Sequence, residues 1–427
     1  MTSRVHWPLV QLDDVADDMT VGYVGPMAAE YVASGVPFLR SQNVEPFRIN
    51  LEDVKFVNDD FHDRLTKSAL RPGDVVIVRT GRPGSAAVIP TSLPVANCSD
   101  VVIVRPGPQL DARFLMYFLN SEAGSGHVSS HLVGAVQQHF NVGSARTLRI
   151  PLPPLPEQRR VARILGALDD KIQLNRRMNR SLESIARAIF RSWFVDLDPA
   201  RKTIEGGDPR PPMARAAESS EAWPESVTRQ LPAGWLLGTL SDVSQLNPEN
   251  WSSESVPESV VYVDLSNTKR GRIESVNSYA RDKAPSRARR VLRPSDTIVG
   301  TVRPGNQSYA LVSEAGLTGS TGFAVLRPTE PKYREIVYLA ATASSNVETL
   351  ALLADGGAYP AISPQLVADT PLVLAPHDIA AAFSRLVGPL LNRMTNSERE
   401  SQILARLRDA LLPHLLTNGE AATGGLQ

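Results

Sequence analysis

The sequence predicts an α+β protein in which two related globular domains alternate with two long helices. Three observations carry this prediction. Apolar residues recur at seven-residue steps in two stretches of about forty residues, short β-branched runs bounded by Gly and Pro precede each stretch, and motifs of the first half return in the second. We therefore expect duplicated domains separated by two antiparallel coiled-coil helices, with pseudo-two-fold symmetry.

The first helical stretch, residues 157–194, has the heptad pattern of a coiled coil. Its seven-residue positions are Val161, Leu168, Leu182 and Ile189. The apolar residues expected to fill the seam between them are Ile164, Met178 and Ile185. The pattern predicts one continuous helix whose apolar stripe packs against a partner helix.

The second stretch, residues 378–416, repeats the first. Its seven-residue positions, each 222 residues after its counterpart, are Phe383, Leu390, Leu404 and Leu411. Leu386 and Leu407 are expected at the intermediate seam positions. The polar interruptions keep step as well, because Asn175 corresponds to Ser397. A duplicated helical spacer is the economical interpretation.

The repeat extends into the sequence before each helical stretch. Leu-Arg-Pro-Gly-Asp at 70–74 returns as Leu-Arg-Pro-Ser-Asp at 292–296, and Arg-Pro-Gly at 82–84 returns at 303–305. The order is therefore globule, helix, globule, helix. Because the termini of a domain often lie close together, the second helix is expected to run back antiparallel to the first, with the globules at opposite ends of the helical pair.

These patterns set the expected domain boundaries. Globular domains are expected at 1–153 and 231–375, and helical spacers at 154–195 and 376–416. Residues 196–230, rich in Pro, Gly, Ser and charge, predict an exposed linker, and residues 417–427 a frayed tail. The first domain should contain strands at 36–40, 74–79, 86–89 and 101–105 and a helix at 111–120.

Bulk composition excludes several classes of protein. No apolar run approaches the roughly 20 residues of a membrane span, and the N-terminal sequence lacks the apolar core of a secretion signal. We expect a cytoplasmic protein with no membrane association. The single Cys98 excludes an internal disulfide and a cysteine-based zinc site. The formal net charge of zero gives no global attraction to nucleic acid.

A family resemblance becomes specific at the start of the first long helix. The segments Pro153–Gln158 and Phe190–Asp196 closely resemble the central region of specificity (S) subunits of type I restriction-modification systems. The Trp7-Pro8 and Gly234-Trp235 openings and the half-chain repeat match as well. The first half also has a glutamine turn, Gly134-Ala135-Val136-Gln137, that is typical of these subunits. The second half departs from the pattern, because residues 375–378 replace the Pro-Glu-Gln helix start and residues 357–360 replace the glutamine turn.

The resemblance implies two target-recognition domains, each binding one half of a bipartite double-stranded DNA site, with the helical pair as a ruler. A helix of 38 residues spans roughly 57 Å, or about 17 base pairs of DNA. It also implies two docked adenine methyltransferase (M) subunits, with restriction (R) subunits joining in the full complex. The chain itself would be non-catalytic and without cofactor. S-adenosylmethionine, ATP and Mg²⁺ are expected on the partner subunits.

Motifs for independent catalysis are missing. The stretch closest to the tetrapeptide of a DNA amino-methyltransferase, Asn247-Pro248-Glu249-Asn250, lacks its second Pro and its aromatic residue, and there is no phosphate-binding loop or His-Glu-x-x-His motif. The alternatives to a restriction complex are the specificity subunit of a methylation-only or other phage-defence system, and a coiled-coil scaffold that does not bind DNA. A methyltransferase or nuclease acting alone is a further rival.

Candidate DNA contacts lie in glycine-punctuated or polar turns. Freed backbone N–H groups beside Arg suit phosphate oxygens, and Asn and Gln can pair with adenine. The candidates are Arg79, Arg82, Ser85, Gln137, Gln138, His139, Arg303, Asn306, Gln307 and Tyr309. A tight surface hairpin or a satisfied polar turn would explain the same residues. Trp193 and Phe194 would suit either a partner anchor or burial against the adjoining globule.

Overall fold

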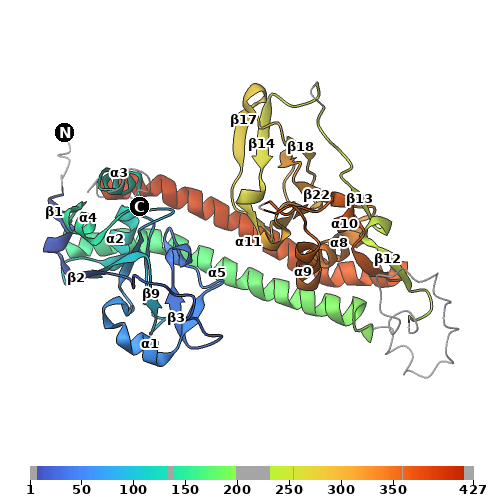
Figure 1. Ribbon diagram of the computed structural model, residues 1–427. Coiled ribbons are helices and arrows are strands. Elements are labelled where there is room, and N and C mark those ends of the chain that lie inside the picture. The colour runs from blue at the N-terminus through green and yellow to red at the C-terminus, as the bar shows by residue number, and fades with distance from the viewer. Residues whose placement is uncertain (1–6, 133–138, 199–230, 253, 358, 418–427) are drawn as a thin grey trace, which may run out of the picture. The chain divides into compact units, whose positions relative to one another are not determined.

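The structure, a computed structural model, describes residues 7–132, 139–198, 231–252, 254–357 and 359–417, and it confirms the α+β class (Figure 1). The chain divides into two compact units, Met1–Leu174 with Glu400–Gln427, and Asn175–Arg399. Two long helices, α5 (Leu155–Phe194) and α11 (His377–Thr417), each contribute to both units.

The first unit is built on short strands. A four-stranded antiparallel sheet has the order β2 (Ala16–Val21), β10 (Val101–Pro106), β7 (Val75–Val78) and β8 (Ala86–Val88). A second sheet has the order β6 (Lys55–Val57), β3 (Val36–Leu39) and β9 (Asn97–Cys98), with β3 and β9 parallel. Two pairs complete the unit, β1 (Leu9–Gln11) with β11 (Arg149–Pro151), and β4 (Val44–Glu45) with β5 (Arg48–Ile49). The four strands expected from the sequence are confirmed.

The described residues of this unit include four shorter α-helices, and a polar side chain caps each one. They are α1 (Asp59–Arg64), α2 (Ala112–Leu119), α3 (Glu122–Ser130) and α4 (Val142–Thr147). A side-chain oxygen of the preceding Asn58, Asp111, Ser121 or Asn141 accepts a backbone N–H of the first turn. Helix α2 is buried from Phe114 to Leu119 and forms the centre of the core.

The Pro-Glu-Gln signature has a structural explanation. The side chain of Gln158 is fully buried, and its Nε2 donates hydrogen bonds to the carbonyl oxygens of Gln109 and Pro153 at 2.9 and 2.8 Å. Its Oε1 accepts the backbone N–H of Asp111 at 2.8 Å. Three hydrogen bonds from one buried amide thus tie the first turn of α5 to the start of α2.

The second unit has a corresponding set of sheets. One sheet has the order β13 (Ser244–Leu246), β22 (Phe323–Pro328), β19 (Thr297–Gly300) and β20 (Tyr309–Leu311). Another has β17 (Asn277–Ala280), β14 (Ser259–Val263), β21 (Leu317–Ser320) and β18 (Ala288–Val291), with β14 and β21 parallel. The pairs are β12 (Leu236–Thr239) with β23 (Pro371–Leu374), and β15 (Thr268–Lys269) with β16 (Arg272–Ile273).

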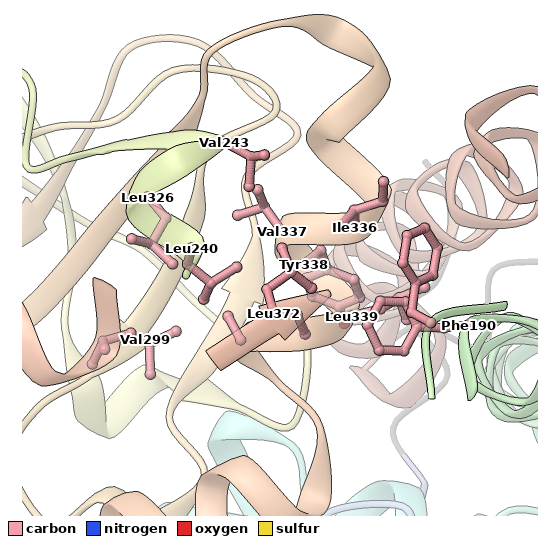
Figure 2. Packing of buried hydrophobic residues seen from close by; sticks show 14 of the residues in the cluster. Phe190, Leu240, Val243, Val299, Leu326, Ile336, Val337, Tyr338, Leu339 and Leu372 are labelled. Carbon is pink, nitrogen blue, oxygen red and sulfur yellow. The ribbon is translucent and has the colours of Figure 1, made fainter. Parts of the chain in front are cut away.

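The core of the second unit gathers side chains from the sheet, from α8 (Arg334–Ala341) and from α5. Figure 2 shows Ile336, Tyr338 and Leu339 of α8 beside Phe190 of α5. Helices α9 (Ser344–Leu352) and α10 (Pro364–Ala368) cover the same core. An aromatic cluster closes it at the end of α5, where Phe194 is buried against Trp235 and Phe383, and Trp193 also contacts Phe383. Trp193 and Phe194, the two aromatic residues at the end of α5, therefore both pack against the core of this unit.

In each unit, the Asp of the Leu-Arg-Pro-x-Asp motif pairs with the Arg of a second repeated motif, Val104-Arg105-Pro106 or Leu326-Arg327-Pro328. In the second unit, Arg327 Nε and Nη2 donate to the two carboxylate oxygens of Asp296, both at 2.8 Å. In the first unit, Arg105 Nε lies 3.8 Å from Asp74 Oδ1. In both, the same carboxylate also accepts a backbone N–H three residues earlier in the chain. The Leu-Arg-Pro-x-Asp repeat therefore supplies the turn that leads into β7 or β19, and the paired Arg fixes this turn to the neighbouring strand.

Helices α5 and α11 pack against each other within each unit. In the second, Asn175 Nδ2 donates to Ser397 O at 3.3 Å and Asn179 Nδ2 to Met394 O at 3.2 Å. In the first, Lys171 pairs with Glu400 at 3.4 Å, and Asp169 with Arg408 at 2.7 Å. Partner numbers on α11 fall as numbers on α5 rise, so the helices are antiparallel in both places.

Four of the five intermediate positions expected in the helical seam are wrong, whereas the fifth, Met178, is half-buried. Ile164, Ile185, Leu386 and Leu407 are 37, 49, 49 and 46% exposed. The inward positions lie one residue later, at Leu165, Ala186 and Val387, each fully buried. The spacing along the seam alternates four and three residues, starting with four, whereas the sequence pattern was assigned with three first.

The eight seven-residue positions themselves face inward to different degrees. Val161 and Phe383 are fully buried. Those that are half-buried are Leu168, Leu182, Ile189, Leu390, Leu404 and Leu411. The large apolar side chains at the displaced intermediate positions face solvent rather than the seam.

Candidate nucleic-acid interface

In the first unit, the predicted contact loop is a tight hairpin between β7 and β8. Val78 N donates to Ser85 O, Gly84 N to Val78 O, and Ser85 N to Arg82 O. Gly81 and Gly84 have φ angles of 83° and 92°, which favour glycine. Arg82 at the tip is exposed, whereas Arg79 and Ser85 at the base are half-buried. The loop is therefore the tight hairpin that the sequence allowed, and it also carries an exposed arginine, Arg82, at its tip.

A carboxylate that the sequence interpretation missed anchors this loop. Asp100 follows β9 with a φ of 56°, and its side chain accepts hydrogen bonds from the hydroxyls of Ser41, at 2.7 Å, and Thr80. The Asp100 carbonyl oxygen accepts the backbone N–H of Arg79. Segments that follow β3, β7 and β9 therefore meet at one edge. A polar pair, Ser-Asp, directly before the apolar run of β10 was the available sequence signal.

Residues 139 and 140, which follow the predicted glutamine turn in the sequence, lie at the same edge. Gln137 and Gln138 lie outside the described residues. His139 is half-buried, and the next residue, Phe140, donates its backbone N–H to Arg79 O at 3.1 Å. Arg79 in turn directs its Nε to Phe140 O at 3.4 Å. The structure thus places His139 beside the 79–85 loop, which sequence separation alone did not indicate.

In the second unit, the matching loop contains the 3₁₀ helix η7 (Pro304–Asn306) between two residues of left-handed conformation. Arg303 and Gln307 have φ angles of 48° and 58°. The Arg303 guanidinium lies 4.6 Å from the ring centroid of Tyr359, which is 70% exposed. Gln307 Oε1 accepts from Arg270 Nε at 2.9 Å. Stacking on Tyr359 holds Arg303 at the surface, while Asn306 is exposed beside it.

Tyr309 does not share this exposure. It lies in β20, is 8% exposed and packs in the core of the second unit, where burial raises the pKa of its hydroxyl. The loop pattern placed it at the surface, but the residue is the first of a strand and its side chain lies in the core. Tyr309 in this position does not suit a contact with DNA.

The strand ends of the second unit also carry an arginine that was not among the candidates. Arg287 Nε donates to Tyr262 Oη at 3.1 Å, and its Nη2 to Asp264 Oδ2 at 3.0 Å. Its backbone carbonyl accepts Thr321 N. Arg287 sits in a run of basic residues that the sequence shows, but its carboxylate partner lies 23 residues away, so no local motif pointed to it.

The stretch Asn247–Asn250, closest to a methyltransferase tetrapeptide, has a different setting. The carboxylate of Glu249 accepts two hydrogen bonds from Arg293, at 2.7 and 2.6 Å, and one from Arg327. The hydrogen bonds from Arg293, and to a lesser degree that from Arg327, lower the pKa of the Glu249 carboxyl to about 2. Glu249 therefore belongs to the ion-pair cluster around Asp296.

Sequence comparison finds one group of similar proteins. Residues 6–184 match the family described as type I restriction modification DNA specificity domain. The chain is 22% identical over 408 residues to the specificity subunit of the type I restriction enzyme HindI from Haemophilus influenzae, covering 83% of this chain and 88% of the relative. The MjaIX specificity subunit from Methanocaldococcus jannaschii is 19% identical over 325 residues, covering 71% and 68%. The chain resembles the specificity subunits of type I restriction-modification systems.

The likeness to specificity subunits extends to the fold. A crystal structure of the type I restriction-modification S subunit from M. genitalium superposes with a TM-score of 0.55 at 14% identity, covering 98% of both chains. The region matched by the specificity domain, residues 6–184, contains the loop 79–85, Asp100 and His139. The second-unit residues Arg303, Asn306 and Gln307 lie beyond it.

Two further observations bear on the class of site. Within the described ranges, no group of three or more His, Cys, Asp or Glu side chains is arranged to hold a metal ion. None of the helices in those ranges is long and apolar enough to cross a membrane. Cys98 is buried, and burial raises its thiol pKa.

Proposed function

We propose that this chain is the DNA sequence-specificity subunit of a type I restriction-modification complex, and that each unit reads one half of a bipartite site. The observation that carries the proposal is one strand framework used twice with different polar side chains at its ends. Arg40 and Asp264 occupy equivalent places, each preceding a 3₁₀ helix, η2 (Ser41–Asn43) or η5 (Leu265–Asn267), after β3 or β14. Constant scaffolds with divergent loop ends suit recognition of two different sequences.

The duplicated domains and the helical spacers are part of this proposal. The corresponding strand orders of the two units and the antiparallel contacts within each support target-recognition domains at 1–153 and 231–375, with spacers at 154–195 and 376–416. The 40 residues of α5 span roughly 60 Å. A pair of such helices would set the number of unspecified base pairs between the half-sites.

The chain would act without catalysis of its own. Two adenine methyltransferase subunits would dock on it and carry S-adenosylmethionine, and restriction subunits would bring ATP- and Mg²⁺-dependent activities. Recognition of DNA would leave base flipping and methyl transfer to these partners. Binding of S-adenosylmethionine to the isolated chain would contradict this assignment and favour a methyltransferase acting alone.

The decisive experiment is to map methylated adenines in cells that carry this protein with its methyltransferase partner. The expected result is a bipartite motif with two different half-sites. Replacing residues 1–153 with another recognition domain should change one half-site and leave the other as it was. A continuous motif, or a change in both half-sites, would refute the two-reader arrangement, and the absence of any motif would favour a scaffold that does not bind DNA.

A further inference from the structure

Arg287 is held by two side chains yet remains exposed. Tyr262 Oη accepts from its Nε at 3.1 Å, and Asp264 Oδ2 accepts from its Nη2 at 3.0 Å. Tyr262 is 2% exposed and packs in an apolar cluster, so it provides a rigid support. The Arg287 side chain is nevertheless 60% exposed. The guanidinium is therefore fixed in direction while one of its edges faces solvent.

The geometry determines which edge is free. Nε and Nη2 form one side of the planar guanidinium, and both are engaged. The outer edge, formed by Nη1 and the remaining N–H of Nη2, is left, and within the described part of the chain no hydrogen bond involves Nη1 of Arg287. Two parallel N–H groups of an arginine match O6 and N7 of guanine in the major groove. The side chain thus presents a prealigned donor pair.

Charge compensation favours a base over a phosphate. The positive charge of Arg287 is paired with the Asp264 carboxylate, so the pair contributes little net attraction to the DNA backbone. Contacts with phosphate draw their energy from uncompensated charge and counterion release. Hydrogen bonding to a neutral base edge needs fixed donors rather than net charge. Arg287 meets the second requirement.

Arg287 lies along the same edge as the candidate loop of the second unit. Its carbonyl oxygen accepts Thr321 N, and the adjacent Gly322 carbonyl accepts both the backbone N–H and the hydroxyl of Thr301. Arg303 follows Thr301 by two residues and stacks on Tyr359. Hydrogen bonds at the adjacent residues Thr321 and Gly322 thus connect Arg287 to Thr301, at the start of the 301–307 loop.

Among the described residues of the first unit, no pair is equivalent to Asp264–Arg287. At the place of Asp264 stands Arg40, whose Nη2 donates to the Asp53 carbonyl oxygen at 2.8 Å. The backbone bond from Asn43 N to Arg40 O repeats that from Asn267 N to Asp264 O. The side chains that hold Arg287 are therefore specific to the second unit, although both units share the same backbone hydrogen bond at this place.

We propose that Arg287 is a specificity-determining residue that reads a guanine in the half-site bound by the second unit, with Tyr262 and Asp264 as positioning residues. The assignment rests on the proposed function, because it requires that this unit binds DNA. It adds to that function which base is recognised, guanine, and which residue recognises it, Arg287. A surface ion pair with no role in binding is the competing explanation.

The test uses the full-length protein with its methyltransferase partner, and selection of bound duplexes from a random DNA pool, for the wild type and for R287A, R287K and D264N. In R287A, preference for guanine at one position of one half-site should fall roughly 5- to 150-fold. R287K should retain only part of the preference, because a lysine keeps N–H donors but lacks the parallel donor pair of an arginine. D264N should weaken the same position and no other. R281A serves as the matched control, since Arg281 is an exposed arginine of the same unit that donates to the Glu254 carbonyl oxygen.

Each alternative outcome is distinct. Equal loss of affinity for all sequences in R287A, with a smaller dependence of binding on salt, would make Arg287 a phosphate contact and overturn the proposal. An unchanged motif would leave only the surface ion pair and would also overturn it. If the wild-type complex selects no sequence, the proposed function itself fails. Circular dichroism of each variant checks that the fold is retained.

Discussion

Arg327 donates two hydrogen bonds of 2.8 Å to the carboxylate of Asp296, whose side chain is completely buried. The pair connects β22 to the turn that precedes β19. Glu249 adds a second carboxylate to the same guanidinium. Because two motifs repeated in the sequence supply this ion pair, its conservation between the two halves reflects folding of the sheet rather than DNA contact.

Removing the charge of Asp296 should destabilise the second unit. In D296N, the Arg327 guanidinium keeps Glu249 as a counter-charge but loses its two hydrogen bonds to the Asp296 carboxylate, which should lower the free energy of unfolding by about 1.5–3 kcal/mol. Differential scanning calorimetry should show a lower melting temperature for this unit. The first-unit counterpart D74N should have a smaller effect, because Arg105 Nε approaches Asp74 only to 3.8 Å and Arg105 keeps its bond to Asp18. Equal losses in both variants would contradict the prediction.

The stability of the second unit should depend on pH through Glu249. Its pKa is lowered from 4.5 to about 2 by hydrogen bonds from Arg293 and Arg327. A carboxyl group with a lowered folded-state pKa stabilises the fold fully above its unfolded pKa and loses this contribution as the pH falls toward the folded value. The melting temperatures of wild type and E249Q should therefore differ at pH 6 to 7 and converge between about pH 4.5 and 2. E348Q, at an exposed position of α9, should show no such convergence.

Arg408 should hold α11 to the first unit. Its guanidinium pairs with Asp169 at 2.7 Å and lies 3.8 Å from the ring centroid of Phe47. Tyr117 Oη donates to the same carboxylate at 2.6 Å. In R408A the buried Asp169 loses its counter-charge, and the free energy of unfolding of the first unit should fall by about 3–5 kcal/mol. R406A, exposed on the same helix, should change it by less than about 0.5 kcal/mol. Urea denaturation of both variants would measure the difference.

Lengthening the helical pair should alter spacing without altering recognition. One heptad inserted after Met178, with a matching heptad after Met394, adds about 10 Å to the pair. Under the proposed function, the methylation motif should gain about three unspecified base pairs, at 3.4 Å per base pair. Both half-site sequences should stay the same. A change in either half-site, with the protein still folded, would show that the spacer is not a simple ruler.

The sequence predicted the elements well and their detailed contacts less well. Heptad periodicity and flanking Pro located both long helices to within two residues, because a regular apolar repeat is a strong local signal. The seam was displaced by one residue at Ile164 and its equivalents. Steps of three and four residues both leave an apolar residue on the stripe, and only packing against the partner helix decides which one is buried.

Candidate site residues were less predictable because their environments are assembled from distant segments. Arg82 and Asn306 were recognised as exposed loop residues from local Gly and Pro. Tyr309 was misplaced, since the first residue of a strand and the last residue of a loop look alike in sequence. The roles of Asp100 and Arg287 depend on partners that long-range strand pairing supplies, and a single sequence does not reveal such pairing.

Helix α11 has a consequence for synthesis on the ribosome. The first unit is completed by residues from Glu400 onward, and Leu412 and Leu416 are buried in its core beside Phe114. The amino-terminal domain therefore emerges first but keeps an uncovered apolar surface until nearly the whole chain has been translated. A premature stop late in the message would damage the earliest-made domain, so release of an incomplete product yields an aggregation-prone protein rather than a half-functional reader.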